Sequence, residues 1–281
     1  MKNVNIKPKE KSFFNSELLS ILICEDGFCY ALWNYEENNI EALVSYSFKD
    51  KNNFIFEIKD FLSNNNLLEK QFSKVNIIIA TNEATLIPNS LFLQEKIEDI
   101  FKFNFELSNS KKILYCELAK TDNNLIFSIN LNLYNFFTEI FKNPVFYHSA
   151  TSFIEINYLE NKKTKNRKKT KVYLQIYNDF FEILIIDNEL ILLYNTYKYK
   201  TDNDLLYYII NIFEQLKLSQ EDTEICISGF IERNNNAIIM LKKFVRFVYF
   251  SATNTAFRYN FKLQDISPHY YYNFLNIFLC E

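Results

Sequence analysis

Few residues of this chain are placed where they could do chemistry, and the clearest group is Glu25-Asp26-Gly27. These residues stand between the apolar runs SILIC and FCYALWNY, a position typical of a β-hairpin turn. Glycine at a turn lets backbone N–H groups approach a phosphate. However, the chain has only 2 glycines among 281 residues, which removes most ways of wrapping backbone around a phosphate. A plain hairpin turn is therefore the first interpretation, and a phosphate contact is the alternative.

The histidines and cysteines do not predict a metal site. His148 and His269 are the only histidines, and neither has a Cys or Asp neighbour at ligand spacing. Cys24 and Cys29 flank the first turn, where strand alternation predicts buried core positions. The total of 5 cysteines is odd and includes no Cys-x-x-Cys pair, so reduced thiols are expected rather than disulfides.

The composition predicts a protein with a large core. Hydrophobic residues make up 48% of the chain and aromatic residues 17%, which argues against a disordered chain. No stretch of 18 apolar residues occurs, and residues 1–15 lack the apolar core of a signal peptide. We therefore expect a cytoplasmic protein without a transmembrane segment.

One pattern of elements occurs twice, which indicates a duplication; chance likeness of two α/β segments is the alternative. In the first copy, a three-strand meander, a helix and a buried strand are predicted at 20–24, 28–35, 40–48, 53–72 and 75–80. In the second copy, the strands are predicted at 172–177, 180–187, 189–199 and 224–228. The second helix begins at Thr201 and Asp204, which have capping-box spacing, and its apolar face is Leu205, Ile209, Ile212 and Leu216.

Additional segments separate the two copies. A helix, two strands and two further helices are predicted at 91–107, 113–120, 125–131, 133–141 and 151–160. The run KKTKNRKKTK, from Lys162 to Lys171, then forms a basic linker. The rest of the chain is acidic, so we expect a solvated loop here rather than a surface for RNA or lipid.

A duplicated meander-helix-strand unit with a small insertion in its first half resembles the actin-like ATPase superfamily. The layout is most similar to the actin-like proteins of pilus assembly and cell division. More narrowly, the chain resembles an uncharacterised bacterial family, the one numbered 3822 among domains of unknown function. The stretches that carry this resemblance are ATNEATLIPNSLF, KFNFEL, VFYHSATSFIE, LLYNTYKYKTDNDLLYYIINIFEQL and ISPHYYYNFLNIFLCE.

The resemblance implies an α/β protein with a duplicated actin-like (ribonuclease H-like) fold. Its two lobes would hold a small α+β subdomain inserted in the first. The parts are then a flexible arm at 1–17, a first lobe at 18–161 with the insert at about 90–143, the basic linker at 162–171 and a second lobe at 172–281.

The resemblance also implies where a nucleotide would bind. Active members hold ATP between the lobes, with an Asp-x-Gly hairpin from each lobe at the phosphates and a Gly-Gly turn near the adenosine. In an ungapped comparison the three positions read Glu25-Asp26-Gly27, Gln175-Ile176-Tyr177 and Ser228-Gly229-Phe230. The first hairpin is followed by the bulky Phe28. The second lacks both the acid and the glycine, although an offset comparison brings Asp179 nearer the pocket.

These changes predict a vestigial nucleotide pocket with no catalytic residue and no bound metal. No cofactor is expected, and binding of ATP and Mg²⁺ is disfavoured. The ending HYYYNFLNIFLCE has no Lys or Arg to face lipid headgroups, so we expect it to dock in the protein's own core; a membrane anchor is the alternative.

We therefore expect a non-catalytic actin-like protein that acts as a cytoplasmic scaffold and binds another protein. An ATP-binding switch or ATPase is the alternative from the enzyme class. A further alternative is an accessory factor in RNA or ribosome maturation, which would contact RNA through Lys162–Lys171.

Overall fold

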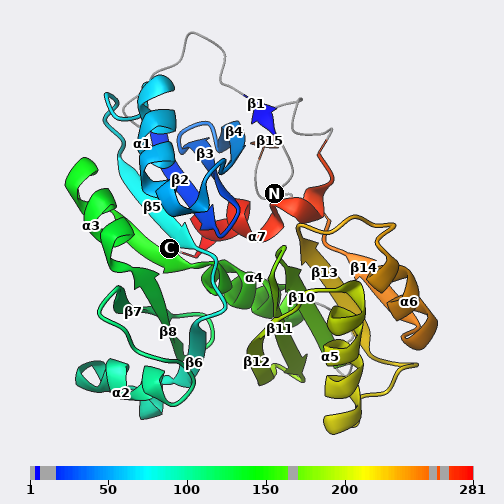
Figure 1. The fold of residues 1–281 in the computed structure, drawn as a ribbon. Coiled ribbons are helices and arrows are strands. Elements are labelled where there is room, and N and C mark those ends of the chain that lie inside the picture. Colours follow the sequence, from blue (N-terminus) through cyan, green and yellow to red (C-terminus); the bar gives the residue numbers. More distant parts are fainter. Residues whose placement is uncertain (1–3, 7–16, 164–169, 253–257, 260–265, 281) are drawn as a thin grey trace.

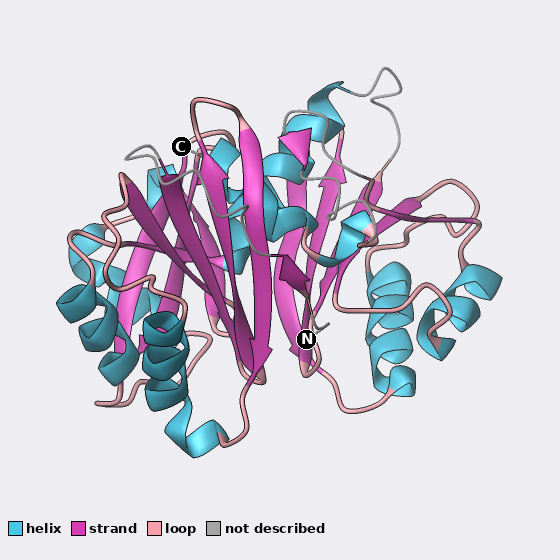
Figure 2. Cartoon of the chain, turned by 90° about the horizontal axis from the view of Figure 1, so that it is seen from above, coloured by secondary structure: helices cyan, strands magenta, loops and turns pink. Residues whose placement is uncertain are grey.

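Two lobes built on the same plan make up the molecule (Figure 1). The computed structural model describes residues 4–6, 17–163, 170–252, 258–259 and 266–280. Most of the predicted arm at 1–17 and of the predicted basic linker lies outside the described residues. Seen from above, helices lie on both outer flanks, and further helices lie between the two groups of strands (Figure 2). None of the helices in the described part is long and apolar enough to span a membrane.

The first lobe is a mixed sheet in the order β1-β4-β3-β2-β5-β9, with β15 also paired to β4. Every residue of β2 and β3 is buried, because both faces of these strands are covered. Residues 5 and 6 pair with β4, so this piece of the predicted loose arm is ordered. The strands are β1 (Asn5–Ile6), β2 (Glu17–Cys24), β3 (Gly27–Asn34), β4 (Asn39–Ser47), β5 (Lys74–Ile79), β9 (Val145–His148) and β15 (Arg258–Tyr259).

The second lobe repeats this order as β12-β11-β10-β13-β14. The central pair is parallel in both lobes, with Ile23 opposite Ile79 in the first and Ile176 opposite Gly229 in the second. The repeat confirms that the fold is duplicated. The strands are β10 (Lys171–Ile176), β11 (Phe180–Asp187), β12 (Leu190–Lys198), β13 (Glu224–Gly229) and β14 (Phe247–Phe250).

The outer helices cover one face of each sheet. These are α1 (Phe54–Asn64) and α3 (Leu131–Ile140) in the first lobe, and α5 (Asp202–Gln215) and α6 (Asn236–Phe244) in the second. Helix α5 begins with the predicted capping box of Thr201 and Asp204. Its predicted apolar face is buried except for Leu216, which is the C-cap and is exposed. Helix α1 ends earlier than predicted, and Asn66 just beyond it has the left-handed φ of 55°.

The insert is a three-stranded sheet in the order β6-β8-β7. Its strands are β6 (Ala84–Pro88), β7 (Lys111–Leu118) and β8 (Asn123–Asn130). The predicted helix at 91–107 is wrong in length. Only α2 (Ile97–Lys102) is α-helical, and the chain before it forms 3₁₀ turns at Asn89–Leu91 and Gln94–Lys96.

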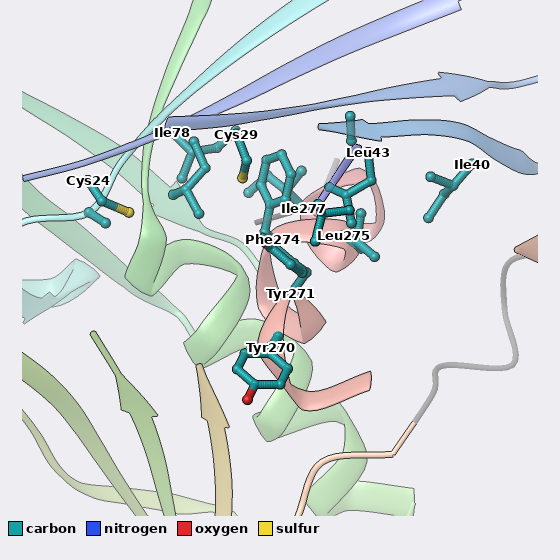
Figure 3. Packing of buried hydrophobic residues seen from close by; sticks show 14 of the residues in the cluster. Cys24, Cys29, Ile40, Leu43, Ile78, Tyr270, Tyr271, Phe274, Leu275 and Ile277 are labelled. Atoms are coloured by element: carbon teal, nitrogen blue, oxygen red, sulfur yellow. The ribbon is translucent and has the colours of Figure 1, made fainter. Parts of the chain in front are cut away.

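The two halves exchange their last helices. Helix α4 (Ser149–Lys163) ends the first half, yet Phe153 and Ile154 pack with Tyr173 and Leu184 of the second sheet. The C-terminal segment, which comprises α7 (Tyr272–Leu275) and the 3₁₀ turns Pro268–Tyr270 and Asn276–Leu279, packs on the first sheet instead. Figure 3 shows its apolar side chains directed at strands of the first lobe. The prediction that this ending docks in the protein's core is confirmed.

Both glycines of the chain are explained by backbone packing. A Cβ at Gly27 would lie 2.2 Å from the carbonyl oxygen of Tyr46 on β4. A Cβ at Gly229 would lie 2.1 Å from the carbonyl oxygen of Ile176 on β10, and Gly229 also has a φ of +102°. Phe230 N–H donates to that same Ile176 oxygen at 2.6 Å. The fold therefore requires glycine at both positions, whatever the protein binds.

The substitution Gly229→Ala should destabilise the protein by about 3 kcal/mol or more, because the new methyl group meets β10 and the backbone is in a region that L-residues avoid. Urea unfolding measures this change. Ser63→Ala, on the exposed surface of α1, is the control and should shift the free energy of unfolding by less than about 0.5 kcal/mol. Equal midpoints for wild type and Gly229→Ala would contradict this account of the glycine.

Candidate functional site

The tips of the two central hairpins meet between the lobes. The β2–β3 turn consists of Glu25 and Asp26, since Cys24 pairs with Gly27. The β10–β11 turn consists of Asn178 and Asp179, since the Tyr177 N–H donates to the Phe180 carbonyl at 2.9 Å. The Asn178 side-chain amide donates to Asp26 Oδ2 at 2.5 Å. The polar ends of the two lobes are thus in direct contact.

The ungapped comparison of the two hairpins is wrong by three residues. It set Gln175-Ile176-Tyr177 against Glu25-Asp26-Gly27, but Gln175 and Ile176 lie within β10. The paired ends of the central strands make Ile176 the counterpart of Ile23, so Asn178 corresponds to Glu25 and Asp179 to Asp26. The second turn therefore keeps an acid, whereas Phe180 stands at the counterpart of Gly27.

Carboxyl groups dominate the contact between the tips. Glu25 accepts a hydrogen bond from Asp179 and another from Lys51 Nζ, whose distance to Glu25 Oε1 is 2.8 Å. Burial, and then the hydrogen bond with Glu25, raise the pKa of Asp179 to about 6. The hydrogen bonds from Asp179 and Lys51 lower the pKa of Glu25. Below a pH of about 6, Asp179 therefore holds the proton of this pair, and the Glu25 carboxylate accepts the hydrogen bond.

Aromatic side chains fill the space beneath the second turn. Tyr177, which is only 2% exposed, stacks on Phe180 with 4.6 Å between ring centroids. Its ring also meets Phe230 edge-on at 5.7 Å, and Phe230 in turn meets Tyr271 of the C-terminal segment at 5.6 Å. Phe28, by contrast, faces the outer side of its sheet and packs against Phe61 of α1. Tyr177 is therefore the ring that lies between the lobes, and Phe28 is not.

Two other predicted pocket residues, Gln175 and Ser228, are held by the C-terminal segment. Asn273 of α7 donates to Gln175 Oε1, and to Ser228 Oγ at 2.9 Å. Ser228 Oγ lies 2.5 Å from Gln175 Oε1 and 3.1 Å from the Leu174 carbonyl oxygen, to both of which it can donate. All three side chains are buried. This network joins α7 to the second sheet, which gives Gln175 and Ser228 partners within the chain.

The two histidines occupy matching places and have structural partners. Each lies just before an exchanged helix and contacts a carbonyl oxygen after a central strand: His148 Nε2 contacts Thr81 at 3.0 Å, and His269 Nε2 contacts Ile231 at 2.9 Å. Burial lowers the pKa of His148 to about 3 and raises the pKa of the neighbouring Glu182 to about 8. Both groups are therefore neutral at pH 7. Among the described residues, no group of three or more His, Cys, Asp or Glu is arranged to hold a metal ion.

The pair of acids at the hairpin tips predicts a pH-dependent difference between wild type and Asp179→Asn. The pKa of Asp179 is about 6 in the folded protein and 3.8 ordinarily, so the wild type loses stability as pH rises from about 4 to about 6. The amide can donate to Glu25 without ionising. Asp179→Asn should therefore gain stability relative to wild type across that window.

Urea unfolding at pH 4, 5, 6 and 7 measures this difference, with Asp60→Asn on the exposed surface of α1 as the matched control. The free-energy difference between wild type and Asp179→Asn should grow through the window by more than the difference for Asp60→Asn. A level difference for Asp179→Asn would rule out the shared proton.

Comparison with known proteins identifies the family and the fold. The profile of the family described as "Protein of unknown function (DUF3822)" matches residues 9–248. A protein of Bacteroides thetaiotaomicron with an actin-like ATPase fold and unknown function is 24% identical, with a TM-score of 0.83 over 95% of this chain and 97% of that chain. The PilM–PilN type IV pilus biogenesis complex contains a chain that is 11% identical, with a TM-score of 0.61 over 95% of this chain and 98% of that chain. No curated protein sequence matches. The predicted actin-like fold is confirmed.

Proposed function

The chain belongs to the DUF3822 family of unknown function and has an actin-like fold, and from this premise we propose that it is a non-catalytic, cytoplasmic scaffold protein. The proposal has two parts. The site between the lobes no longer serves a nucleotide, and the molecule acts by presenting surfaces to a protein partner.

One observation carries the first part: the hairpin tips touch. In actin-like ATPases these two tips would lie on either side of the phosphates. Here Asn178 donates to Asp26 across the two tips. A triphosphate would have to break this contact to enter.

The charges at the tips also disfavour a nucleotide. Three carboxyl groups, from Glu25, Asp26 and Asp179, meet where phosphate oxygens would have to lie. Lys51, the cation paired to them, already forms an ion pair with Glu25. A phosphate group placed here would lose hydration and face groups of its own sign, which raises the free energy of binding.

The protein-partner part rests on the fold and on one similar structure. PilM, whose fold this chain shares, is found in a complex with PilN. An actin-like protein that does not hydrolyse ATP would act by binding other proteins. Its function then depends on which of its surfaces a partner recognises.

The ATP-binding switch remains the second candidate because one observation favours it. Asp26 and Asp179 occupy matching positions at the two tips, as carboxylates that hold magnesium would.

The RNA alternative has no such support, since most of the basic run lies outside the described residues. Of its described members, Lys171 pairs with Glu224 at 3.6 Å and Lys162 lies over the ring of Tyr158.

Affinity purification from the protein's native cells tests the scaffold role. The tag belongs at the N-terminus, because the C-terminal segment packs in the core. We expect one other protein to co-purify in a fixed ratio and to stay bound in about 0.3 M salt, which screens exposed charges. Adding Mg-ATP should leave that ratio unchanged. Recovery of the chain alone would contradict the scaffold role, and release of the partner by Mg-ATP would favour the switch.

A further inference from the structure

A groove lies on the outer surface of the second lobe, away from the hairpin tips. It has a volume of about 370 Å³ and is lined by residues of α5 from Asn203 to Glu214 and by Phe244 at the end of α6. The two helices lie side by side at the edge of the molecule (Figure 1). The lining residues of α5 recur along the helix at Asn203, Tyr207, Ile210 and Glu214, and so follow one face for about three turns.

The groove is apolar and open. Tyr207 is 65% exposed and Phe244 is 43% exposed, while Leu206 and Ile210 are half-buried. Ile239 and Met240 of α6 are exposed as well. Large apolar side chains gathered on one face of a soluble protein mark a surface for contact with another molecule. In the first lobe, Phe56 of α1 is an aromatic residue that is exposed to a similar extent as Tyr207, at 62%.

One charge in the groove has no ion-pair partner among the residues that the structure describes. Glu214 is the charged residue among those that line the groove, and it lies in the last turn of α5. Helix α5 has no basic residue in that turn, whereas α6 ends with Lys242 and Lys243. Because the C-terminal end of a helix is negative, a carboxylate there is unfavourable unless a cation offsets it. Within the described part of the chain, Glu214 forms no ion pair.

We propose that this groove binds an amphipathic α-helix of a partner protein, with a Lys or Arg of that helix beside Glu214. Apolar side chains at helical spacing would cover Leu206, Tyr207 and Ile210. The span from Asn203 to Glu214 is about 16 Å, which matches a partner helix of about eleven residues. The proposal rests on the scaffold function and assigns its surface.

The same charge argues against a second copy of this chain as the occupant. A symmetric dimer would place the same patch on both sides of the interface. Two Glu214 carboxylates would then enter one apolar contact with no cation between them, which costs free energy. A partner helix with a Lys or Arg can pair with Glu214. A second copy of this chain would place another Glu214 carboxylate there instead.

Site-specific cross-linking in native cells tests the proposal. The photoreactive substitution Tyr207→p-benzoylphenylalanine places the label in the groove, and Phe56→p-benzoylphenylalanine on α1 is the matched control. We expect Tyr207 to cross-link to one segment of another protein, with apolar residues at helical spacing and a Lys or Arg. A synthetic peptide of that segment is then titrated against the purified full chain.

Charge reversal gives the decisive comparison. Glu214→Lys should weaken peptide binding by about tenfold, since an attraction becomes a repulsion. A peptide whose basic residue is changed to Glu should regain affinity for Glu214→Lys. Phe56→Ser should leave binding unchanged, while Tyr207→Ser should weaken it. Equal affinities for wild type, Tyr207→Ser and Glu214→Lys would overturn the proposal.

Other outcomes separate this proposal from the scaffold function. A cross-link from Tyr207 to another copy of the chain would make the groove a self-interface and end the proposal. A co-purified partner that Tyr207 never cross-links would leave the scaffold function standing and exclude this groove. Absence of any co-purified partner and of any cross-link would count against both.

Discussion

The exchange of the two terminal helices is the constraint on which the rest of the structure depends. Each half ends in a helix that covers the inner face of the other half's sheet, so neither sheet can bury its inner face alone. Phe153 and Ile154 of α4 cover the second sheet, and Phe274 and Leu275 of the C-terminal segment cover the first. Burial of such side chains typically stabilises by about 1.5 to 3 kcal/mol each. The lobes are therefore held together by the hydrophobic contacts that each exchanged helix makes with the opposite sheet.

This arrangement brings the hairpin tips together and determines what they can do. The buried network of Gln175, Ser228 and Asn273 ties the C-terminal segment to the second sheet. The same segment places Tyr271 against Phe230, which continues to Tyr177 beneath the second turn. With the interior filled, the polar tips are left to bond each other through Asp26 and Asn178. Gln175, Ser228, Asp26 and Asn178 therefore all have hydrogen-bond partners within the chain.

Much of the fold could be predicted from the sequence, because the duplicated order of strands and helices is written in hydrophobic periodicity. The capping box at Thr201 is local and was therefore predictable. Short elements were missed: β9 and β14 have four residues each, too few for a clear period, and α6 has nine. The ending of the chain is apolar all round, so its pattern predicted burial but could not say which sheet it covers.

The candidate site was harder to predict, for two physical reasons. The residue at which a strand ends depends on its pairing with neighbouring strands. The ungapped comparison of the sequence contains no information on pairing, so it did not show that β10 continues through Ile176. It therefore placed the second turn too early and did not align Asp179 with the acid of the first turn. The sequence also grouped Gly27 and Gly229 with a vestigial nucleotide pocket, although a plain turn was the first interpretation of Gly27. Tight contact with the backbone of Tyr46 and Ile176 requires both glycines. The helix exchange and the groove beside Glu214 both depend on contacts between segments that are far apart in the sequence. No single stretch of sequence therefore predicts either of them.

We propose that the hairpin tips bind each other and not a nucleotide. Amide hydrogen exchange of the two turns, Glu25–Gly27 and Tyr177–Phe180, tests it most directly, measured with and without saturating Mg-ATP. We expect each turn to exchange at the same rate with and without Mg-ATP. Slower exchange in both turns when Mg-ATP is added would contradict it, because the tips would then be closing on a bound nucleotide.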